Sequence, residues 1–408
     1  MQQTIVNKFK HLKVAIVHDL LVRVGGAETV LLELLKIFPH ADIFTVLYDK
    51  EPFVKAGKRW AIIYNKNVKT SKYNFLVSKW WQKLPSILSS DRNYFFLWPK
   101  AVEAFDFSKY DLVISSHFIA AHGVITQEHT LHISYTHTPA RYFYSHYHEY
   151  MNSPFMNKGL GKLKRLIYPP MAYKFRLWDE VASMRPDYYV ANSTAVKMRI
   201  KKYYNRDATV IYPPAELSRF VPTKPVKKKN FYYTLARLVP QKKIDAIVKA
   251  FVKMGKELYV TGKGPEIETL KKIAKGHKNI HLLGFTPDEE VERLYQEAKG
   301  FVFASYEDFG IVPLEAMAAG TPVISFNKGG PLDYIIPGKT GIFFEEQTPE
   351  AIIEAINKFE KIKNWDRNYL INFATQFSTE KFRQEFANFV SQKLEEYNNI
   401  KKPKHHEQ

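Results

Sequence analysis

The chain has 408 residues, a formal net charge of +19 and no cysteine. The length predicts one large domain or two of medium size, and the missing thiols exclude disulfides and thiolate zinc sites. The charge excess indicates an anionic partner, which is a nucleic acid, a phosphorylated substrate or a membrane surface. The first residues do not resemble a signal peptide, and no apolar run reaches the roughly 18 residues of a membrane span, so we expect a cytoplasmic protein.

The first half of the chain alternates short apolar runs with helical patterns. Strands are predicted at residues 13–20, 41–48, 110–117, 131–138 and 187–194, and a helix is predicted directly after the glycine pair at 25–26. Most of these strands end in polar residues. That is typical of parallel strands whose carboxyl ends open onto a site.

Residues 211–231 contain four prolines and then a lysine run, which predicts a linker. The strand-helix alternation then restarts. We therefore expect two doubly wound, Rossmann-like α/β domains over residues 1–215 and 216–378, facing a central cleft. A helix near 380–397 is expected to pack back on the first domain, and residues 398–408 are expected to be a disordered tail.

The stretch from Ser305 to Ser325, SYEDFGIVPLEAMAAGTPVIS, has two glutamates separated by seven residues. Glu307 follows a predicted strand, and Glu315 lies in a short predicted helix. Free backbone N–H groups at the start of that helix could bind an anion, and Glu315 could accept hydrogen bonds from a diol such as ribose. The alternatives are two solvated glutamates or a glycosidase carboxylate pair. The backbone groups concerned belong to Phe309, Gly310, Ile311 and Val312.

This stretch resembles the E-x7-E signature of retaining glycosyltransferases of the family 4 type, which have the two-domain GT-B fold. LARLVPQKKID at 235–245 resembles the pyrophosphate-binding stretch of that family, with Ala236 and Lys243 replacing its usual glycines. VTGKGP and LLGF resemble two further turns of its second domain. VGGAE resembles its first glycine-rich turn, and YTHTP resembles the strand end that carries its active-site histidine.

The resemblance implies a metal-independent, retaining hexosyltransferase without a cofactor, whose donor is a nucleoside-diphosphate sugar, with GDP favoured over UDP. It places His137 and Glu307 at the reacting sugar. From spacing alone, a strand-end histidine bonded to a carbonyl and a plain tight turn at the glycine pair stay open as alternatives. The implied donor-binding residues are Gly25, Gly26, Arg237, Lys242, Phe309, Gly310, Ile311, Val312 and Glu315.

Two stretches combine basic and aromatic residues, a pattern that favours an anionic membrane surface over a solvated helix face. We therefore expect a peripheral protein at the inner face of the cell membrane that acts on a saccharide or lipid-linked saccharide acceptor. ISYTHTPARYFY further resembles a bacterial subgroup linked to mannosyl transfer in surface-polysaccharide assembly. The residues of this surface are Lys79, Trp80, Trp81, Lys83, Lys162, Lys164 and Arg165.

Three other functions stay open as alternatives. One is a UDP-sugar-dependent transferase with a soluble acceptor. Another is a non-enzymatic nucleic-acid binder, for which no recognition motif is found. The third is phosphorylase-like chemistry, which would require a pyridoxal-phosphate lysine. His146 and His148 form an isolated H-x-H, which is a weak metal signal, and no metal is expected.

Overall fold

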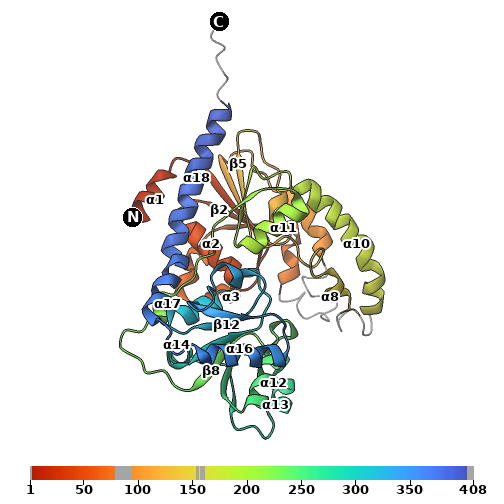
Figure 1. Cartoon of the computed structure of the whole chain (residues 1–408). Helices are drawn as coiled ribbons and strands as arrows, with labels where there is room; N and C mark the ends of the chain where they lie inside the picture. The colour runs from red at the N-terminus through yellow and green to blue at the C-terminus, as the bar shows by residue number, and fades with distance from the viewer. Residues whose placement is uncertain (1, 79–93, 153–155, 157–160, 402–408) are drawn as a thin grey trace. The chain divides into compact units, whose positions relative to one another are not determined.

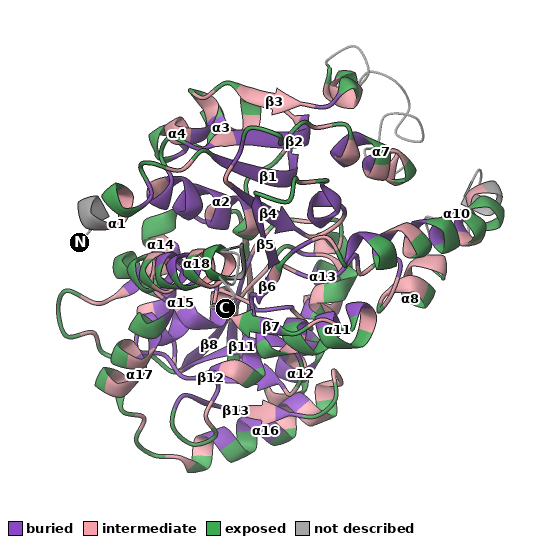
Figure 2. Ribbon diagram, turned by 90° about the horizontal axis from the view of Figure 1, so that it is seen from above, coloured by how far each residue is buried: buried purple, intermediate pink, exposed green. Residues whose placement is uncertain are grey.

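The computed structural model describes residues 2–78, 94–152, 156 and 161–401 (Figure 1). The chain divides into two compact units. The first comprises residues 1–213 and 382–408, and the second comprises residues 214–381. Each unit is built on its own parallel sheet with helices against it, and both cores lie along the strands (Figure 2).

The sheet of the first unit has the strand order β3-β2-β1-β4-β5-β6-β7 among the described residues, and every strand pair is parallel. The order reverses between β1 and β4, the point at which doubly wound folds place their ligands. The strands are Val14–Leu21, Asp42–Tyr48, Val68–Thr70, Leu112–His117, Leu131–Thr136, Tyr188–Ala191 and Ala208–Val210, named β1 to β7 in that order.

Helices cover both faces of this sheet. Residues of β1 alternate between them, with Val14 and Ile16 in one apolar core and Ala15 and Val17 in the other. The helices are α1 (Gln2–Lys8), α2 (Gly26–Ile37), α3 (Glu51–Lys55), α4 (Ala61–Tyr64), α7 (Trp98–Glu103), α8 (Tyr147–Met151), α10 (Gly161–Ala182), α11 (Thr194–Tyr204) and α18 (Thr379–Lys401).

The second unit repeats the same plan with the strand order β10-β9-β8-β11-β12-β13, again all parallel. Its strands are β8 (Phe231–Leu235), β9 (Glu257–Thr261), β10 (Ile280–Gly284), β11 (Gly300–Phe303), β12 (Val323–Phe326) and β13 (Gly341–Phe344). Its helices are α12 (Ile244–Met254), α13 (Ile267–Ala274), α14 (Asp288–Glu297), α15 (Val312–Ala318), α16 (Pro349–Lys361) and α17 (Arg367–Ala374).

The prediction of two doubly wound α/β units is confirmed, and one detail, the end of the last helix, differs from expectation. Helix α10 has Pro169 and Pro170 in its interior, so a proline pair that favours a break in the sequence lies within a continuous helix. Helix α18 packs Phe382, Phe386 and Val390 into the core of the first unit and continues to Lys401. Residues 398–401, predicted as part of a disordered tail, are therefore helical, and residues 402–408 lie outside the described residues.

Candidate active site

The loop between β11 and α15 carries the two signature glutamates. Gly310 has a φ of +82°, a conformation that a residue with a Cβ rarely adopts. The Tyr334 hydroxyl bridges the carbonyl oxygens of Phe309 and Gly310, at 3.0 and 2.8 Å. Within the described part of the chain, the N–H groups of Gly310, Ile311 and Val312 have no hydrogen-bond partner. The loop is thus held from behind, with donors left for a ligand.

A second glycine pair, which the sequence reasoning missed, supports this loop. The Gly330 N–H donates to the Glu307 carbonyl at 3.0 Å. A Cβ on Gly329 would lie 2.2 Å from the same carbonyl oxygen, and one on Gly330 would lie 2.2 Å from Phe309 Cα. The two loops therefore pack backbone against backbone, which only glycine permits. Adjacent glycines shortly after a buried strand were the signal available in the sequence.

Lys242 and Glu307 form an ion pair between neighbouring strand ends. Lys242 ends the short helix η7 (Pro240–Lys242) after β8, and Glu307 follows β11, the strand that pairs with β8. Both side chains are 23% exposed, so the pair is reachable from solvent. Arg237 lies in the same loop after β8 and is exposed. The predicted cations and one predicted carboxylate thus gather at the carboxyl edge of one sheet.

Lys243 has a φ of +55°, in the left-handed region. Glycine adopts this conformation most readily, so the position would also suit a glycine. The G-K-G turn after β9 packs against this loop, since a Cβ on Gly262 would lie 1.8 Å from the Ala236 carbonyl oxygen. The Leu238 N–H donates to the Lys263 carbonyl at 2.9 Å and joins the two turns.

Glu315 lies half-buried on α15 and accepts a hydrogen bond of 3.0 Å from the Tyr295 hydroxyl. Burial raises the pKa of Glu315 to about 7, and the tyrosine hydrogen bond lowers it by less. Around neutral pH the side chain therefore exchanges between an acid and a carboxylate.

In the first unit, His137 follows β5 and belongs to a chain of polar side chains. Its Nε2 lies 2.9 Å from Ser116 Oγ, which also lies 2.9 Å from His18 Nδ1. His18 Nε2 is buried and lies 3.7 Å from a carboxylate oxygen of Glu28, at the start of α2. Burial, and to a lesser extent His18, lowers the pKa of His137 to about 3, so its imidazole is neutral at physiological pH.

Asp19, near the end of β1, contacts the loop that follows β4. The Asp19 carboxylate accepts four backbone hydrogen bonds, of 2.5 to 2.8 Å, from Phe118, Ile119, Ala120 and Ala121. It thereby fixes the loop after β4.

The predicted donor residues Gly25 and Gly26 lie exposed at the start of α2, next to Glu28.

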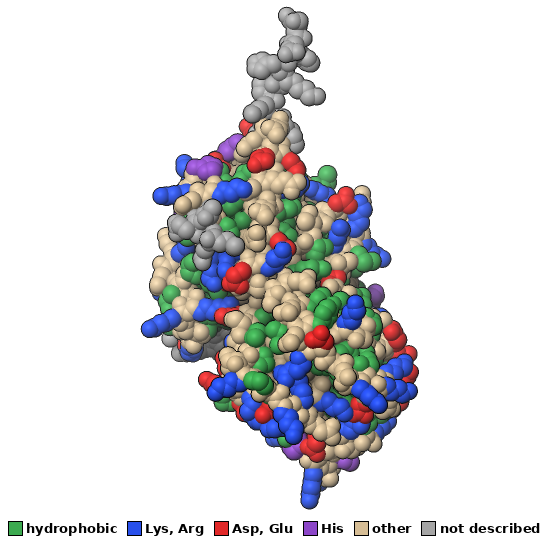
Figure 3. All heavy atoms as spheres, turned by 60° about the vertical axis from the view of Figure 1, so that its left-hand side comes forward, with side chains coloured by type: hydrophobic (Ala, Val, Ile, Leu, Met, Phe, Trp, Pro, Cys, Tyr) green, Lys and Arg blue, Asp and Glu red, His purple; other side chains and the backbone are tan. Residues whose placement is uncertain are grey.

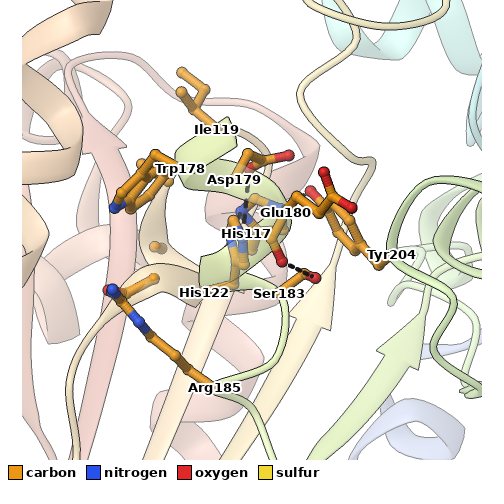
Figure 4. A network of polar contacts seen from close by, with 12 residues as sticks. His117, Ile119, His122, Trp178, Asp179, Glu180, Ser183, Arg185 and Tyr204 are labelled. Atoms are coloured by element: carbon orange, nitrogen blue, oxygen red, sulfur yellow. Dashed lines mark hydrogen bonds and ion pairs between the residues drawn. The ribbon is translucent and has the colours of Figure 1, made fainter. Parts of the chain in front are cut away.

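Asp179 of α10 closes a ring of buried polar side chains with His122, His117 and Tyr204 (Figure 4). His122 Nε2 lies 3.4 Å from Asp179, the two histidines approach at 3.1 Å through their Nδ1 atoms, and His117 Nε2 lies 3.3 Å from the Tyr204 hydroxyl. The same hydroxyl also interacts with Asp179. Burial raises the pKa of Asp179 to about 7 and lowers that of His122 to about 3. One proton on Asp179 would give each contact of this ring a donor and an acceptor.

The residues predicted at a membrane surface are only partly within the described structure. Lys79, Trp80, Trp81 and Lys83 lie outside the described residues. Lys162, Lys164 and Arg165 belong to α10, where Arg165 is exposed and Lys164 is half-buried. None of the described helices is long and apolar enough to cross a membrane. In the described ranges no cluster of three metal-ligating side chains is found, and His146 contacts Ser145 Oγ at 2.9 Å.

On the face of the molecule shown in Figure 3, Lys and Arg side chains are interspersed with Asp and Glu. Nucleic-acid binders typically gather their basic side chains into a patch or stripe. The mixture of signs on this face does not have that character.

Known proteins resemble parts of this chain. Residues 217–377, nearly the whole second unit, match the family model described as glycosyl transferases group 1. The GDP-mannose-dependent alpha-(1-6)-phosphatidylinositol monomannoside mannosyltransferase of Mycobacterium tuberculosis is 33% identical over 138 residues, 30% of this chain and 36% of that protein. The first curated relatives are matched over 40 to 57% of their own length, so the chain spans about half of each.

Two solved structures resemble nearly the whole chain. The apo form of the lipopolysaccharide outer core galactosyltransferase WaaB gives a TM-score of 0.62 at 17% identity, over 94% of this chain and 100% of that one. Anabaena Alr3699/HepE in complex with UDP-glucose gives 0.60 at 18% identity, over 94% and 100%. The predicted GT-B fold is confirmed, and most of the second unit matches the glycosyl transferases group 1 model.

Proposed function

We propose that this protein is a glycosyltransferase that uses a nucleoside-diphosphate sugar as its donor. The observation that carries the proposal is the contact between Lys242 and Glu307, where a cation and a carboxylate meet beside the unpaired N–H groups of the β11–α15 loop. A sugar diphosphate needs all three kinds of group: cations and N–H donors for the phosphates, and a carboxylate for the sugar hydroxyls. The match of this unit to glycosyl transferases group 1 supports the same reading.

The diphosphate is assigned to Arg237, Lys242 and the N–H groups of residues 310–312. When the sugar–phosphate bond breaks, negative charge grows on the diphosphate, and donors already in place stabilise it without reorganisation. In the free protein Lys242 is paired with Glu307. A bound diphosphate would take over the ammonium group, and the released carboxylate would accept hydroxyls of the donor sugar.

The ribose is assigned to Glu315. Only its carboxylate form accepts from both hydroxyls of a diol, whereas the protonated acid has lost part of that capacity. Because the pKa of Glu315 is raised to about 7, nucleotide binding should draw a proton off this side chain near neutral pH.

His137 is assigned to a hydroxyl of the transferring sugar, and the chain behind it sets which nitrogen can accept. If His18 directs its Nε2–H at the Glu28 carboxylate, its Nδ1 accepts the Ser116 O–H. Ser116 Oγ then accepts from His137 Nε2–H, and His137 Nδ1 is left as a hydrogen-bond acceptor. Glu28, His18 and Ser116 are positioning residues in this account.

We further propose that transfer is retaining and needs no metal. The acceptor hydroxyl attacks the sugar carbon from the face that the diphosphate leaves, the sugar–phosphate bond breaks, and a phosphate oxygen takes the acceptor's proton. Glu307 and His137 hold the sugar and form no covalent bond to it. Mannose from GDP-mannose and a lipid-linked saccharide acceptor at the inner face of the cell membrane, in surface-polysaccharide assembly, are the finer assignments. The mycobacterial relative supports the donor.

A thermal-shift panel of GDP, UDP, ADP and their sugars tests the donor. A diphosphate present at about a hundredfold its Kd should stabilise the protein by roughly 2.7 kcal/mol. If UDP-sugars alone bind, the alternative of a UDP-sugar-dependent transferase with a soluble acceptor becomes the better one. If no nucleotide shifts the midpoint while nucleic acid does, the proposal is wrong.

Ser116→Ala tests the assignment of His137. We expect a lower kcat with little change in nucleotide affinity, and a changed 15N chemical shift for the two His137 ring nitrogens. Ser115 lies next to Ser116 on β4, is buried and contacts His132 at 2.9 Å, so it gives the matched control. Ser115→Ala should leave both the kcat and the His137 spectrum unchanged. Equal effects of the two variants would show that the contact between Ser116 and His137 contributes only to core packing.

A further inference from the structure

Helix α10 has an apolar stripe on the side that faces solvent. The helix packs inward through buried residues at alternating spacings of four and three. A second set lies on the opposite side, within an arc of about 80° at 3.6 residues per turn. This set, the α10 stripe, consists of Leu166, Tyr173, Leu177, Val181 and, just beyond the helix end, Met184. Their exposed fractions are 74, 58, 48, 60 and 74%.

The α10 stripe runs for about 27 Å, at 1.5 Å per residue. Figure 2 shows exposed residues recurring along α10, and Figure 1 shows the helix at the periphery of the first unit. Single exposed apolar residues are ordinary on protein surfaces. A helix that is apolar on both its inner and its outer face is not, and indicates a partner for the outer face.

The charges beside the stripe favour one kind of partner. Helix α10 contains five basic residues and two acidic ones, Asp179 and Glu180. Asp179 faces inward and is buried, whereas Glu180, Arg165 and Lys174 are exposed, so the exposed charge of the helix stays net positive. Apolar side chains flanked by cations on one helix are what an anionic bilayer surface accepts, because the apolar groups enter the acyl boundary and the cations reach the headgroups.

The inner face of the helix ties this surface to the interior of the unit. Asp179 belongs to the buried ring of Figure 4, and Trp178 donates to Glu103 at 2.7 Å. A Cβ on Gly123 would lie 2.4 Å from the Trp178 ring, so helix and loop fit closely. A membrane bound to the α10 stripe would therefore hold the loop after β4, and the strand ends beside it, at a fixed depth below the lipid.

We propose that the α10 stripe docks the protein on a bilayer that contains anionic lipid, seating its apolar side chains in the interface with Arg165 and Lys174 at the headgroups. This proposal goes beyond sugar transfer and does not depend on it. It also narrows the basic and aromatic surface expected from the sequence to one face of α10, whose residues can be changed singly.

Flotation with vesicles of phosphatidylcholine, with or without phosphatidylglycerol, tests the proposal on the full chain. We expect wild-type protein to float with the anionic vesicles, more weakly with the neutral ones, and to lose part of the anionic binding in high salt. Arg165→Glu with Lys174→Glu should weaken anionic binding by at least about tenfold, since each basic residue near the surface contributes about one kcal/mol.

The stripe itself is tested by Leu166→Gln, Tyr173→Gln, Leu177→Gln and Val181→Gln in one variant. All four side chains are exposed, so the protein should stay folded, and its thermal shift with nucleotide should match that of wild type. Phe285→Gln with Leu332→Gln in the second unit is the control, with exposed fractions of 71 and 52%. We expect the stripe variant to lose flotation and the control to keep it.

Three results would overturn the proposal. Two are a wild-type protein that ignores anionic vesicles at low salt and a stripe variant that floats as well as the control. The third is a wild-type protein that self-associates in size-exclusion chromatography through a contact that the stripe variant abolishes, because the stripe would then be covered by a second copy of the chain. Failure of every nucleotide to bind would leave the flotation result intact and would count against the proposed transferase alone.

Discussion

Replacing Asp179 by asparagine should make the protein more stable at neutral pH than wild type, by an amount that grows as the pH rises. Asparagine has nearly the same shape, keeps an acceptor for the Tyr144 hydroxyl, which bonds Asp179 at 2.9 Å, and offers an N–H to His122 Nε2. It cannot ionise. The variant therefore removes one property of the side chain, its charge.

The magnitude follows from the pKa. Burial raises the pKa of Asp179 from 3.8 to about 7, so the folded protein holds a proton that the unfolded chain releases. The stability that this bound proton contributes is complete below about pH 3.8, is lost as the pH rises toward 7, and stays lost at higher pH. At 1.36 kcal/mol for each unit of pKa, the loss is ~4 kcal/mol. Asparagine does not ionise, so the variant does not lose this stability as the pH rises.

Urea unfolding of both proteins at several pH values from about 4 to 8 measures the effect. His137, whose low pKa destabilises the fold in acid, lies outside the Asp179 ring and is present in both proteins, so its contribution cancels in the difference. The difference in unfolding free energy should rise with pH and level off above about 7. Glu180→Gln, an exposed change on the same helix, is the control. A constant difference across this range would refute the view that Asp179 is a proton-holding buried acid.

The other predictions concern the donor site. Glu307→Gln should lower kcat about a hundredfold or more with nucleotide affinity nearly kept, measured by steady-state kinetics and calorimetry. Wild-type nucleotide affinity should fall as the pH drops below about 7, and Glu315→Gln should bind more weakly and without that pH dependence; parallel profiles would argue against the ribose assignment. Arg237→Ala and Lys242→Ala should each cost roughly 2–4 kcal/mol of transition-state stabilisation and weaken diphosphate binding at an unchanged thermal midpoint. Lys243→Gly should be tolerated, whereas Lys243→Val should lower stability by about 1–2 kcal/mol, because a β-branched residue resists the left-handed conformation.

Much of the fold could be predicted because parallel strands leave a strong local signal. The apolar runs that end at His117 and Thr136 are buried on both faces, and each is followed by polar residues at the edge of the sheet where ligands bind. The same logic placed Glu307 and Lys242 at strand ends. Their contact depends on β8 and β11 being neighbours, a matter of strand order that follows from the doubly wound fold and not from any local pattern.

The rest of the candidate site required the tertiary structure. His18 and Ser116 come from strands β1 and β4, and their shared contact with His137 crosses a third strand. Nothing in the spacing of those residues along the chain indicates a hydrogen-bond chain, because the sheet order brings together segments about a hundred residues apart. Backbone packing is equally hidden, since the sequence shows the glycines of residues 329–330 but not the loop that needs their missing side chains.

Helix α10 meets two demands with one segment. Its mixture of basic and aromatic residues predicts a surface stretch, whereas the inward residues that fix it as a helix are spread over fifteen positions, from Tyr168 to Ala182. The core fixes the helix, since it buries that inner set, and the prolines are accommodated within it. The outer residues are then under no demand from the core. Their apolar character must come from something that the folded unit alone does not provide, and this is the physical basis for assigning them to a membrane.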